Sequence, residues 1–348
     1  MSAVFARLIA SRLFWPIVML LVLFAINLIA FPGFFAITIK DGHLFGSLID
    51  ILRNGAPTLI IAVGMTLVIA TRGIDLSVGA VCAISGAVAC SIILGSPDPA
   101  NGATVAVAVT VALAISLVLG VWNGFLVAVL GIQPIIATLI LMTAGRGMAM
   151  LITEGQILTV NSPPFKAMGS GFWFGVPIAV IIAAVVFAVA ALLTRRTALG
   201  MLIESVGINP EASRQAGVRA RGLLFAVYTF CAFCAAIAGL ILTANQTAAD
   251  ANNTGLFLEL DAILAVVIGG TSLAGGRYSL AGTLVGALVI QTLVTTVYTV
   301  GIPPIATMVF KAAVVAAVCL LQSPTTNQAL AGFRRRLALR AGKGIAAS

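Results

Sequence analysis

Charge is what this sequence lacks most. Only 8% of its 348 residues are charged, whereas 61% are hydrophobic. An ordinary soluble domain carries about a quarter charged residues and needs them to cover its surface. The composition therefore excludes a soluble fold and indicates an integral membrane protein. The net charge of +9 does not indicate nucleic-acid binding, because the basic residues lie at the ends of apolar runs, where they carry topology information.

Metal ligands and catalytic groups are scarce as well. His43 is the one histidine, and the five cysteines all fall inside apolar runs. Cys231 and Cys234 form a CxxC, but inside a helix and without a nearby histidine that pair is a weak redox signal. The lack of a visible metal cluster or nucleophile–base set argues against an intramembrane enzyme. No G-x-x-x-x-G-K-[ST] phosphate loop occurs, so any ATP must bind a separate subunit, and we expect no cofactor on this chain.

Long uncharged runs recur along the chain. About 20 apolar residues cross a bilayer as a helix, and continuous apolarity favours helices over a barrel. We predict an all-α polytopic membrane protein with eight to ten transmembrane helices, ten being the preferred count. The uncharged run 99–145 is too long for one crossing and should break around 131–134, whereas 262–276 is short for a full crossing. The other expected spans are 13–31, 54–71, 76–97, 175–193, 223–243, 279–300 and 302–322.

The basic residues check this topology. With ten spans and the N-terminus inside, most of the 19 basic residues fall on cytoplasmic segments, as the positive-inside rule requires. This predicts that both termini and a basic tail at 323–348 are cytoplasmic. The cytoplasmic set would comprise Arg7, Arg12, Arg72, Arg195, Arg196, Arg214, Arg219, Arg221, Arg277, Arg334, Arg335, Arg336, Arg340 and Lys343.

Two glycine-flanked polar breaks each lead into a span, GIDLSVG at 73–79 and GGRYSLAG at 275–282. In addition, GIQPIIAT at 131–138 resembles GIPPIAT at 301–307. These pairs favour an internal repeat with broken helices, of the kind that builds transporter binding sites. Short matches also arise by chance in a sequence so rich in small apolar residues.

Five polar residues within or beside spans are candidates for a translocation path or a helix break: Asp75, Ser77, Asn123, Gln133 and Lys311. A charge inside a bilayer is by default a functional candidate, but Asp75 is better explained as the N-cap of the third span. Asn123 and Gln133 could bond sugar hydroxyls or equally join helices.

The other intramembrane charges need partners. Lys311 lies deep, and Asp75, Glu259 and Asp261 are its candidate partners. Arg146 lies near the outer end of its span and could extend its side chain toward the membrane surface.

The longest predominantly polar stretch is 194–222. Asn209 followed by Pro210 is typical of a helix N-cap and first turn, Glu211 suits the positive end of the helix dipole, and Gly217 suits the position after the helix. This predicts a helix over 210–216, preceded by another that ends near Gly207. The two would form a compact knob; the alternative is an ordinary connecting loop whose arginines follow the positive-inside rule.

The same stretch carries a resemblance to a known family. Its pattern Thr197-x-x-Gly200, Ile203, Gly207-x-Asn209, Ala212-x-Arg214, Ala216-Gly217 resembles the cytoplasmic coupling loop of ribose/xylose/galactose-type ABC importer permeases, in the branched-chain/sugar permease family. GIDLSVG and IGGTSLAGG (268–276) resemble two further stretches of these permeases. The segments 41–52 and 249–270 are most similar to the galactofuranose-type subgroup. Ser213 departs from the pattern, since related loops often carry alanine there.

The resemblance implies a single permease domain over 1–348, multi-pass in a bacterial inner membrane, that catalyses no reaction. Its partners would be an ABC ATPase subunit that carries the ATP, a periplasmic sugar-binding protein, and a second permease in a homo- or heterodimer. The cargo would be a monosaccharide, galactofuranose or a pentose or hexose. The resemblance places coupling to the ATPase at Gly200, Glu204, Gly207, Asn209, Ala212, Arg214 and Gly217.

A secondary, ion-coupled sugar transporter remains the alternative. It would use Asp75, Arg146 and Lys311 as a charge relay. The two classes differ in energy source, since the importer requires ATP and the carrier requires an ion gradient.

Overall fold

The structure is a computed structural model that describes residues 13–40, 42–301, 303, 306, 308–313 and 316. Helices make up most of this part of the chain, which confirms an all-α polytopic protein. They are α2 (Phe14–Ala30), α3 (Ser47–Ala70), α4 (Val78–Leu94), α5 (Gly102–Ala128), α6 (Pro134–Ile152), α7 (Pro163–Ser170), α8 (Ile178–Arg196), α9 (Leu199–Ile208), α10 (Pro210–Gln215), α11 (Ala220–Gln246), α12 (Leu258–Ile268) and α13 (Leu280–Thr299).

The strands are short and form two-stranded antiparallel pairs. β1 (Thr38–Lys40) pairs with β2 (His43–Phe45), and β4 (Phe172–Trp173) pairs with β5 (Val176–Pro177). β3 (Leu158–Thr159) pairs with β6 (Ala248–Ala249), which ties the α6–α7 connection to the end of α11.

Six of the described helices are long and apolar enough to cross a membrane: α3, α5, α6, α8, α11 and α13. The long run 99–145 does divide as predicted, because α5 ends at Ala128 and α6 begins at Pro134. α2 and α4 are apolar but have 17 residues each, and α12 has only 11. The count of ten spans therefore stays a prediction, and the expected span at 302–322 and the tail at 323–348 lie largely or wholly outside the described residues.

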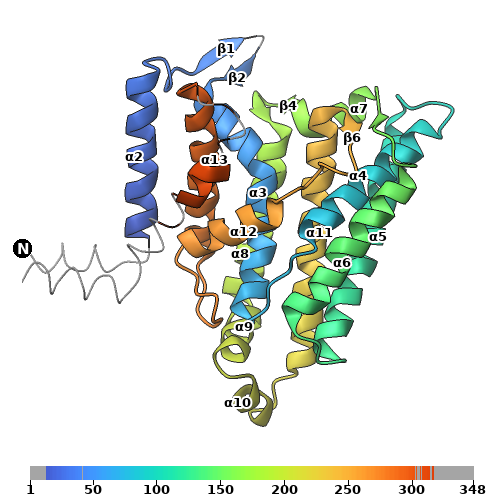
Figure 1. The fold of residues 1–348 in the computed structure, drawn as a ribbon, viewed down its shortest axis with the longest axis vertical. Helices are drawn as coiled ribbons and strands as arrows, with labels where there is room; N and C mark the ends of the chain where they lie inside the picture. The colour runs from blue at the N-terminus through green and yellow to red at the C-terminus, as the bar shows by residue number, and fades with distance from the viewer. Residues whose placement is uncertain are drawn as a thin grey trace, which may run out of the picture.

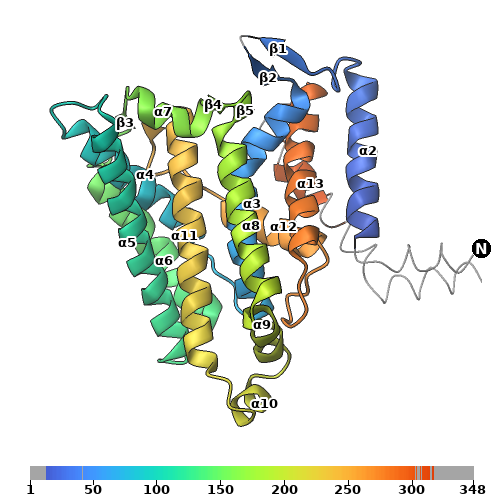
Figure 2. The same ribbon diagram turned by 180° about the vertical axis from the view of Figure 1, so that it is seen from behind.

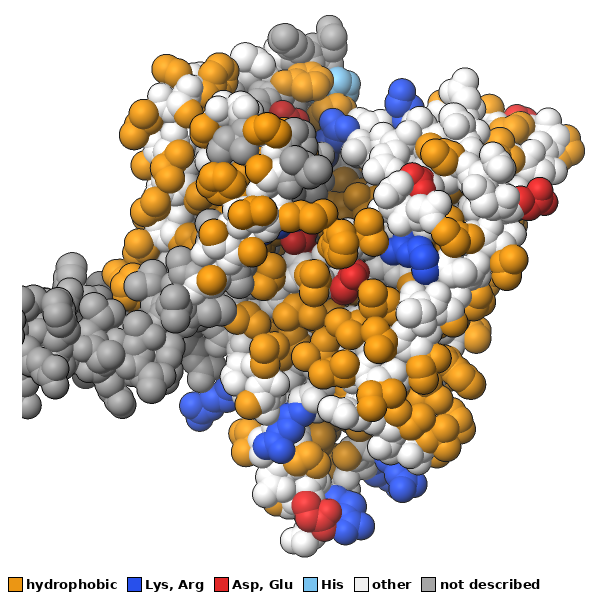
Figure 3. All heavy atoms as spheres, viewed as in Figure 1, with side chains coloured by type: hydrophobic (Ala, Val, Ile, Leu, Met, Phe, Trp, Pro, Cys, Tyr) orange, Lys and Arg blue, Asp and Glu red, His pale blue; other side chains and the backbone are white. Residues whose placement is uncertain are grey.

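The long helices run side by side as a bundle, with α9 and α10 at one end and the β1–β2 hairpin and α7 at the other (Figures 1 and 2). Basic side chains surround the α9–α10 end, and an apolar band lies above them (Figure 3). Local chain order puts seven of the expected cytoplasmic arginines at this end: Arg72, Arg195, Arg196, Arg214, Arg219, Arg221 and Arg277. Charge is thus segregated as the positive-inside rule predicts.

Glycines let the helices pack closely at two places. A Cβ on Gly120 of α5 would lie 2.8 Å from the Cα of Thr229 in α11, and one on Gly124 would lie 3.0 Å from the Cα of Phe225. Gly282 and Gly286 of α13 pack in the same way against the backbone of α12. In both pairs the small residues at i and i+4 let the backbones of the two helices come into contact, as expected for close membrane-helix packing.

Two helices begin in the middle of the bundle. After α3 the chain returns as a non-helical stretch, residues 73–77, and α4 starts only at Val78. A second non-helical stretch, 250–257, leads from the opposite end to α12 (Figure 1). The two starts cross, since a Cβ on Gly79 would lie 2.5 Å from the carbonyl oxygen of Gly255. At the break predicted at 275–282, Arg277 is exposed, and Ser279 caps α13 by accepting from the amide of Gly282 at 3.1 Å. The internal repeat stays a prediction.

Candidate functional site

The polar stretch 194–222 contains two short helices, α9 and α10, which we call the knob; the first residues of the stretch end α8 and the last begin α11. The Asn209 side chain accepts from the amides of Glu211 and Ala212 at 3.1 and 3.0 Å, which confirms the predicted N-cap. Pro210 is the first residue of α10, and Gly217 adopts a φ of +85° after the helix, the left-handed conformation that glycine favours. Capping chemistry alone therefore specifies the local structure, although α10 ends at Gln215, one residue before the predicted end.

The predicted coupling residues divide into two groups. One group faces solvent on the outer part of the knob and comprises Asn209, Ala212, Arg214 and Gly217. The other lies toward the bundle, where Gly200 and Gly207 are buried and Glu204 is half-buried. The outer group can touch a partner, whereas the buried Gly200 and Gly207 can only position the knob.

An ion pair stands on the exposed surface of α10. Arg214 donates to Glu211 at 2.7 and 3.1 Å, and this hydrogen bonding lowers the pKa of the Glu211 carboxyl below its ordinary value. Ser213, the departure from the family pattern, is buried, and its carbonyl accepts from the amide of Val218. A small residue is what this position requires.

The inner end of the knob is held against α3 at a contact we call the α3–α9 junction. Arg72 donates through Nε to the carbonyl of Gly207 and through Nη2 to that of Ile208, the last two residues of α9. The amide of Gly276 donates to the carbonyl of Ala70 at 2.9 Å. A Cβ on Gly207 would overlap this carbonyl oxygen and lie 2.6 Å from the Gly276 nitrogen. Three segments distant in sequence meet here.

Sequence reasoning missed the role of Arg72, which it treated as a marker of the cytoplasmic end of a span. One signal was present, because the adjacent Gly73 and the coupling-loop glycine Gly207 both indicated close backbone approach. Nothing in the sequence indicated that they belong to one contact, since Arg72 and Gly207 lie 135 positions apart.

A second group of polar residues is buried where α4 begins, and we call it the Asp75 cluster. Asp75 is fully buried, and its Oδ1 accepts from the amide and hydroxyl of Ser77 at 3.0 and 2.6 Å. Asn123 of α5 donates to the Ser77 hydroxyl at 2.9 Å and lies 3.5 Å from the same carboxylate oxygen. The structure thus brings together three of the five residues named for a path or a helix break.

Asp75 is not the N-cap of this helix, and that prediction was wrong. α4 begins at Val78, its N-cap residue is Ser77, and the Ser77 side chain makes no cap hydrogen bond. The Asp75 carboxylate instead accepts hydrogen bonds from Ser77, two residues ahead within the non-helical stretch. Its role is to satisfy the polar groups of non-helical backbone that lies inside the bundle.

Thr138 of α6 supports the same stretch. Its hydroxyl accepts from the amide of Leu76 at 3.1 Å and lies 3.2 Å from the carbonyl of Ile74. Residues 73–77 are therefore fastened to α5 through Asn123 and to α6 through Thr138. From the sequence Thr138 was noted only as the end of a repeated motif.

The remaining path candidates lie elsewhere. Gln133 is exposed at the turn before α6 and makes no side-chain cap bond, so it does not join the Asp75 cluster. Lys311 pairs with Asp261, at 2.6 and 2.9 Å, which decides among its three candidate partners.

Arg146 does not extend toward the membrane surface. It turns inward and donates to the carbonyls of Ala251 and Thr254 at 2.9 and 2.7 Å, in the stretch that precedes α12. The prediction that Arg146 reaches the membrane surface was therefore wrong. Its guanidinium instead binds backbone carbonyls of a non-helical stretch inside the bundle. Glu259, buried in the first turn of α12, faces the beginning of α4, where a Cβ on Gly79 would lie 2.5 Å from its Oε2.

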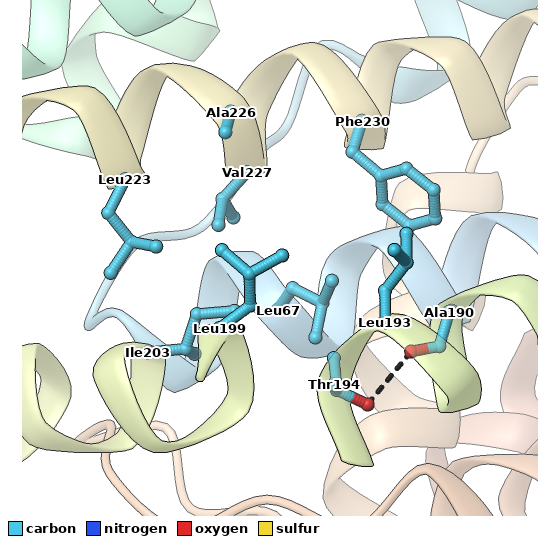
Figure 4. Close-up of a pocket in the computed structure, with 10 residues that line it drawn as sticks. All are labelled: Leu67, Ala190, Leu193, Thr194, Leu199, Ile203, Leu223, Ala226, Val227 and Phe230. Atoms are coloured by element: carbon cyan, nitrogen blue, oxygen red, sulfur yellow. Dashed lines mark hydrogen bonds between the residues drawn. The ribbon is translucent and has the colours of Figure 1, made fainter. Parts of the chain in front are cut away.

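An apolar cavity of about 200 Å³ lies behind the knob. Leu199 and Ile203 of α9 form one wall, and residues of α3, α8 and α11 form the others (Figure 4). Thr194 is its one polar side chain, and the hydroxyl is bonded to the carbonyl of Ala190. This cavity offers a sugar almost no hydrogen bonds, so we interpret it as a packing defect that leaves free volume between α9 and the bundle. The lining residues are Leu67, Ala190, Leu193, Thr194, Leu199, Ile203, Leu223, Ala226, Val227 and Phe230.

The chain is similar in sequence to known transport proteins. A family model described as "Branched-chain amino acid transport system / permease component" matches residues 47–319. The chain is 50% identical over 331 residues to the galactofuranose transporter permease protein YtfT of Escherichia coli (strain K12), covering 93% of this chain and 95% of that protein. It is 45% identical over 348 residues to the fructose import permease protein FruF of Bifidobacterium longum (strain NCC 2705), covering 98% and 96%.

A more distant relative is the ribose import permease protein RbsC of Escherichia coli (strain K12), 39% identical over 303 residues that cover 86% of this chain and 90% of that protein. No solved structure matches the chain significantly.

Proposed function

The chain belongs to the branched-chain amino acid transport system / permease component family, and on that premise we propose that it is the transmembrane permease subunit of an ABC importer for a monosaccharide. Three relatives that match along most of the chain are named for galactofuranose, fructose and ribose. A sugar is therefore a better supported cargo than an amino acid. Galactofuranose is the first candidate to test, because that relative shares 50% identity.

The partners follow from the same premise. An ATPase subunit binds the knob at the basic, cytoplasmic end of the bundle, and a periplasmic sugar-binding protein delivers cargo to the opposite end. A second permease, identical or not, completes the transmembrane unit in the inner membrane. This chain performs no chemistry and binds no ATP; its task is to change shape when the ATPase does.

One observation carries the proposal, namely the form of the knob. A connecting loop with no function need not be capped at both ends of a helix and hydrogen-bonded to distant backbone. Here Asn209 and Gly217 define the outer helix, and Arg72 fixes the inner one to the bundle. A rigid exposed element attached to the membrane helices can transmit force from a soluble partner.

The rival carrier mechanism requires communication among Asp75, Arg146 and Lys311. Among the described residues, hydrogen bonds join each of these to a different group: Ser77 and Asn123, two backbone carbonyls, and Asp261. That arrangement favours three separate structural roles over a relay.

Reconstitution in proteoliposomes tests the proposal. The permease, together with its ATPase subunit and its sugar-binding protein, should take up labelled galactofuranose or another monosaccharide only when ATP is supplied inside. Replacing Glu204 or Arg214 by alanine should lower sugar-stimulated ATP hydrolysis without loss of membrane insertion, while Arg196→Ala, outside the knob, should not. Uptake that follows a proton or sodium gradient without ATP would refute the importer and support the carrier.

A further inference from the structure

Arg72 links the end of α9 to the non-helical stretch that follows α3. Its backbone forms part of the turn between α3 and the non-helical stretch 73–77, with a φ of +64°. Its side chain reaches the other way and holds the last two carbonyls of α9. A guanidinium is suited to this, because its fixed fork of donors can bind two neighbouring oxygens at once and it carries positive charge to the negative end of a helix dipole.

The junction grips α9 at one end only. Around Arg72 the contacts are close, since Gly207 lies against Ala70 and the Arg72 side chain packs against Gly275. Toward its other end, Leu199 and Ile203 border the apolar cavity of about 200 Å³ (Figure 4). When the knob is displaced, α9 can therefore move into free volume on the cavity side, whereas at Arg72 it remains hydrogen-bonded to the bundle.

Beyond Arg72 the chain has little freedom to absorb displacement. Three residues on, Asp75 is fully buried and bonded to Ser77 and Asn123. Thr138 holds the backbone on either side of it. A movement that enters this stretch is passed to α5 and α6, both of which border the beginning of α4.

We propose that Arg72 is the latch that transmits displacement of the knob into residues 73–77, and through Asn123 and Thr138 into α5 and α6. It is a positioning residue that touches no cargo. The inference rests on the proposed function, because the displacement is supplied by the ATPase. The covalent links through α8 and α11 hold the knob in place but bypass the stretch that contains Asp75.

The test uses the reconstituted transporter with its ATPase and binding protein. Arg72→Gly removes the side chain and also suits the left-handed backbone, so folding is preserved; Arg72→Ala removes the side chain without that relief. Both should lower sugar-stimulated ATP hydrolysis about tenfold, within the usual range of coupling between sites, while binding of the ATPase to the permease is unchanged. Arg72→Lys should restore part of the coupling, and Arg277→Ala, the loss of an exposed cation at the same end, should have no effect.

Hydrogen exchange separates a latch from a merely structural residue. In the wild type, adding a non-hydrolysable ATP analogue should change amide exchange both in the knob and at 73–77. In Arg72→Gly the knob should still respond and 73–77 should not. If 73–77 responds in the variant as in the wild type, or if Arg72→Gly couples normally, the latch is refuted. If the wild type itself shows no dependence on ATP, the importer assignment fails instead.

Discussion

Replacing Gly207 by alanine is the most discriminating change to the knob. Alanine favours a helix more than glycine does, by up to about 1 kcal/mol, so α9 on its own would be stabilised. In the folded protein the added methyl would overlap the carbonyl oxygen of Ala70 and lie 2.6 Å from the nitrogen of Gly276, where ordinary contact begins near 3.4 Å. Both neighbours are backbone atoms that cannot rotate away.

The size of the effect follows from what must break. To make room, α9 has to move away from α3 by more than about an ångström, and this movement stretches the two hydrogen bonds from Arg72. Hydrogen bonds to a charged group contribute about 1.5–3 kcal/mol each, so we expect a loss of about 3 kcal/mol in the attachment of α9. That corresponds to a reduction of roughly a hundredfold in the equilibrium constant between the closed and the open junction.

Sugar-stimulated ATP hydrolysis in proteoliposomes is the measurement, with thermal unfolding in detergent as the check on folding. Gly222→Ala is the matched control, because a Cβ there meets nothing within 4 Å and the residue lies in a helix, α11. We expect Gly207→Ala to lose most of the stimulation and the control to keep it. Equal stimulation in the two variants would refute the account of the junction.

Three further predictions concern other parts of the molecule. Asn123→Leu should lower the free energy of unfolding by about 1–3 kcal/mol in detergent, because a buried carboxylate and hydroxyl lose their donor, whereas exposed Gln133→Leu should change little; equal effects would contradict the Asp75 cluster. Lys311→Met should cost about 1.5–3 kcal/mol by leaving Asp261 unpaired, and adding Asp261→Leu should recover most of it, failing which the pair is not the cause. The lowered pKa of Glu211 means that the ion pair on α10 contributes above the carboxyl's ordinary pKa and is lost as pH falls through the lowered value; the protection of amides 211–215, measured against their intrinsic exchange rate at each pH, should thus fall only in acid, and a fall near pH 7 would contradict this.

Local chemistry explains what could be predicted of the knob. Asn209, Pro210 and Gly217 act on backbone groups two or three positions away, so their effect is visible in the sequence. The break between α5 and α6 was predictable for a similar reason, because bilayer thickness limits the length of a crossing helix. The division of the coupling residues into outward and inward groups was not, since it depends on which face of α9 meets α3.

Two predictions from the sequence were wrong, and both concern charged residues inside the bundle. Asp75 was expected to cap a helix and Arg146 to reach the surface, both on general preferences of isolated helices. In the structure each instead satisfies backbone in a non-helical stretch, 73–77 or 250–257. A sequence does not show how deeply a polar segment such as 250–257 enters the bundle.

The sequence by itself determined that this is a helical membrane protein, where most of its helices begin and end, and that 194–222 forms a capped element. Those properties depend on hydrophobicity summed over a span and on hydrogen bonds between near neighbours. Only the tertiary structure decided that Lys311 pairs with Asp261, that Asn123 and Thr138 meet 73–77, and that Arg72 holds the end of α9. Such contacts join residues from about 50 to 135 positions apart, and packing of the whole bundle selects them.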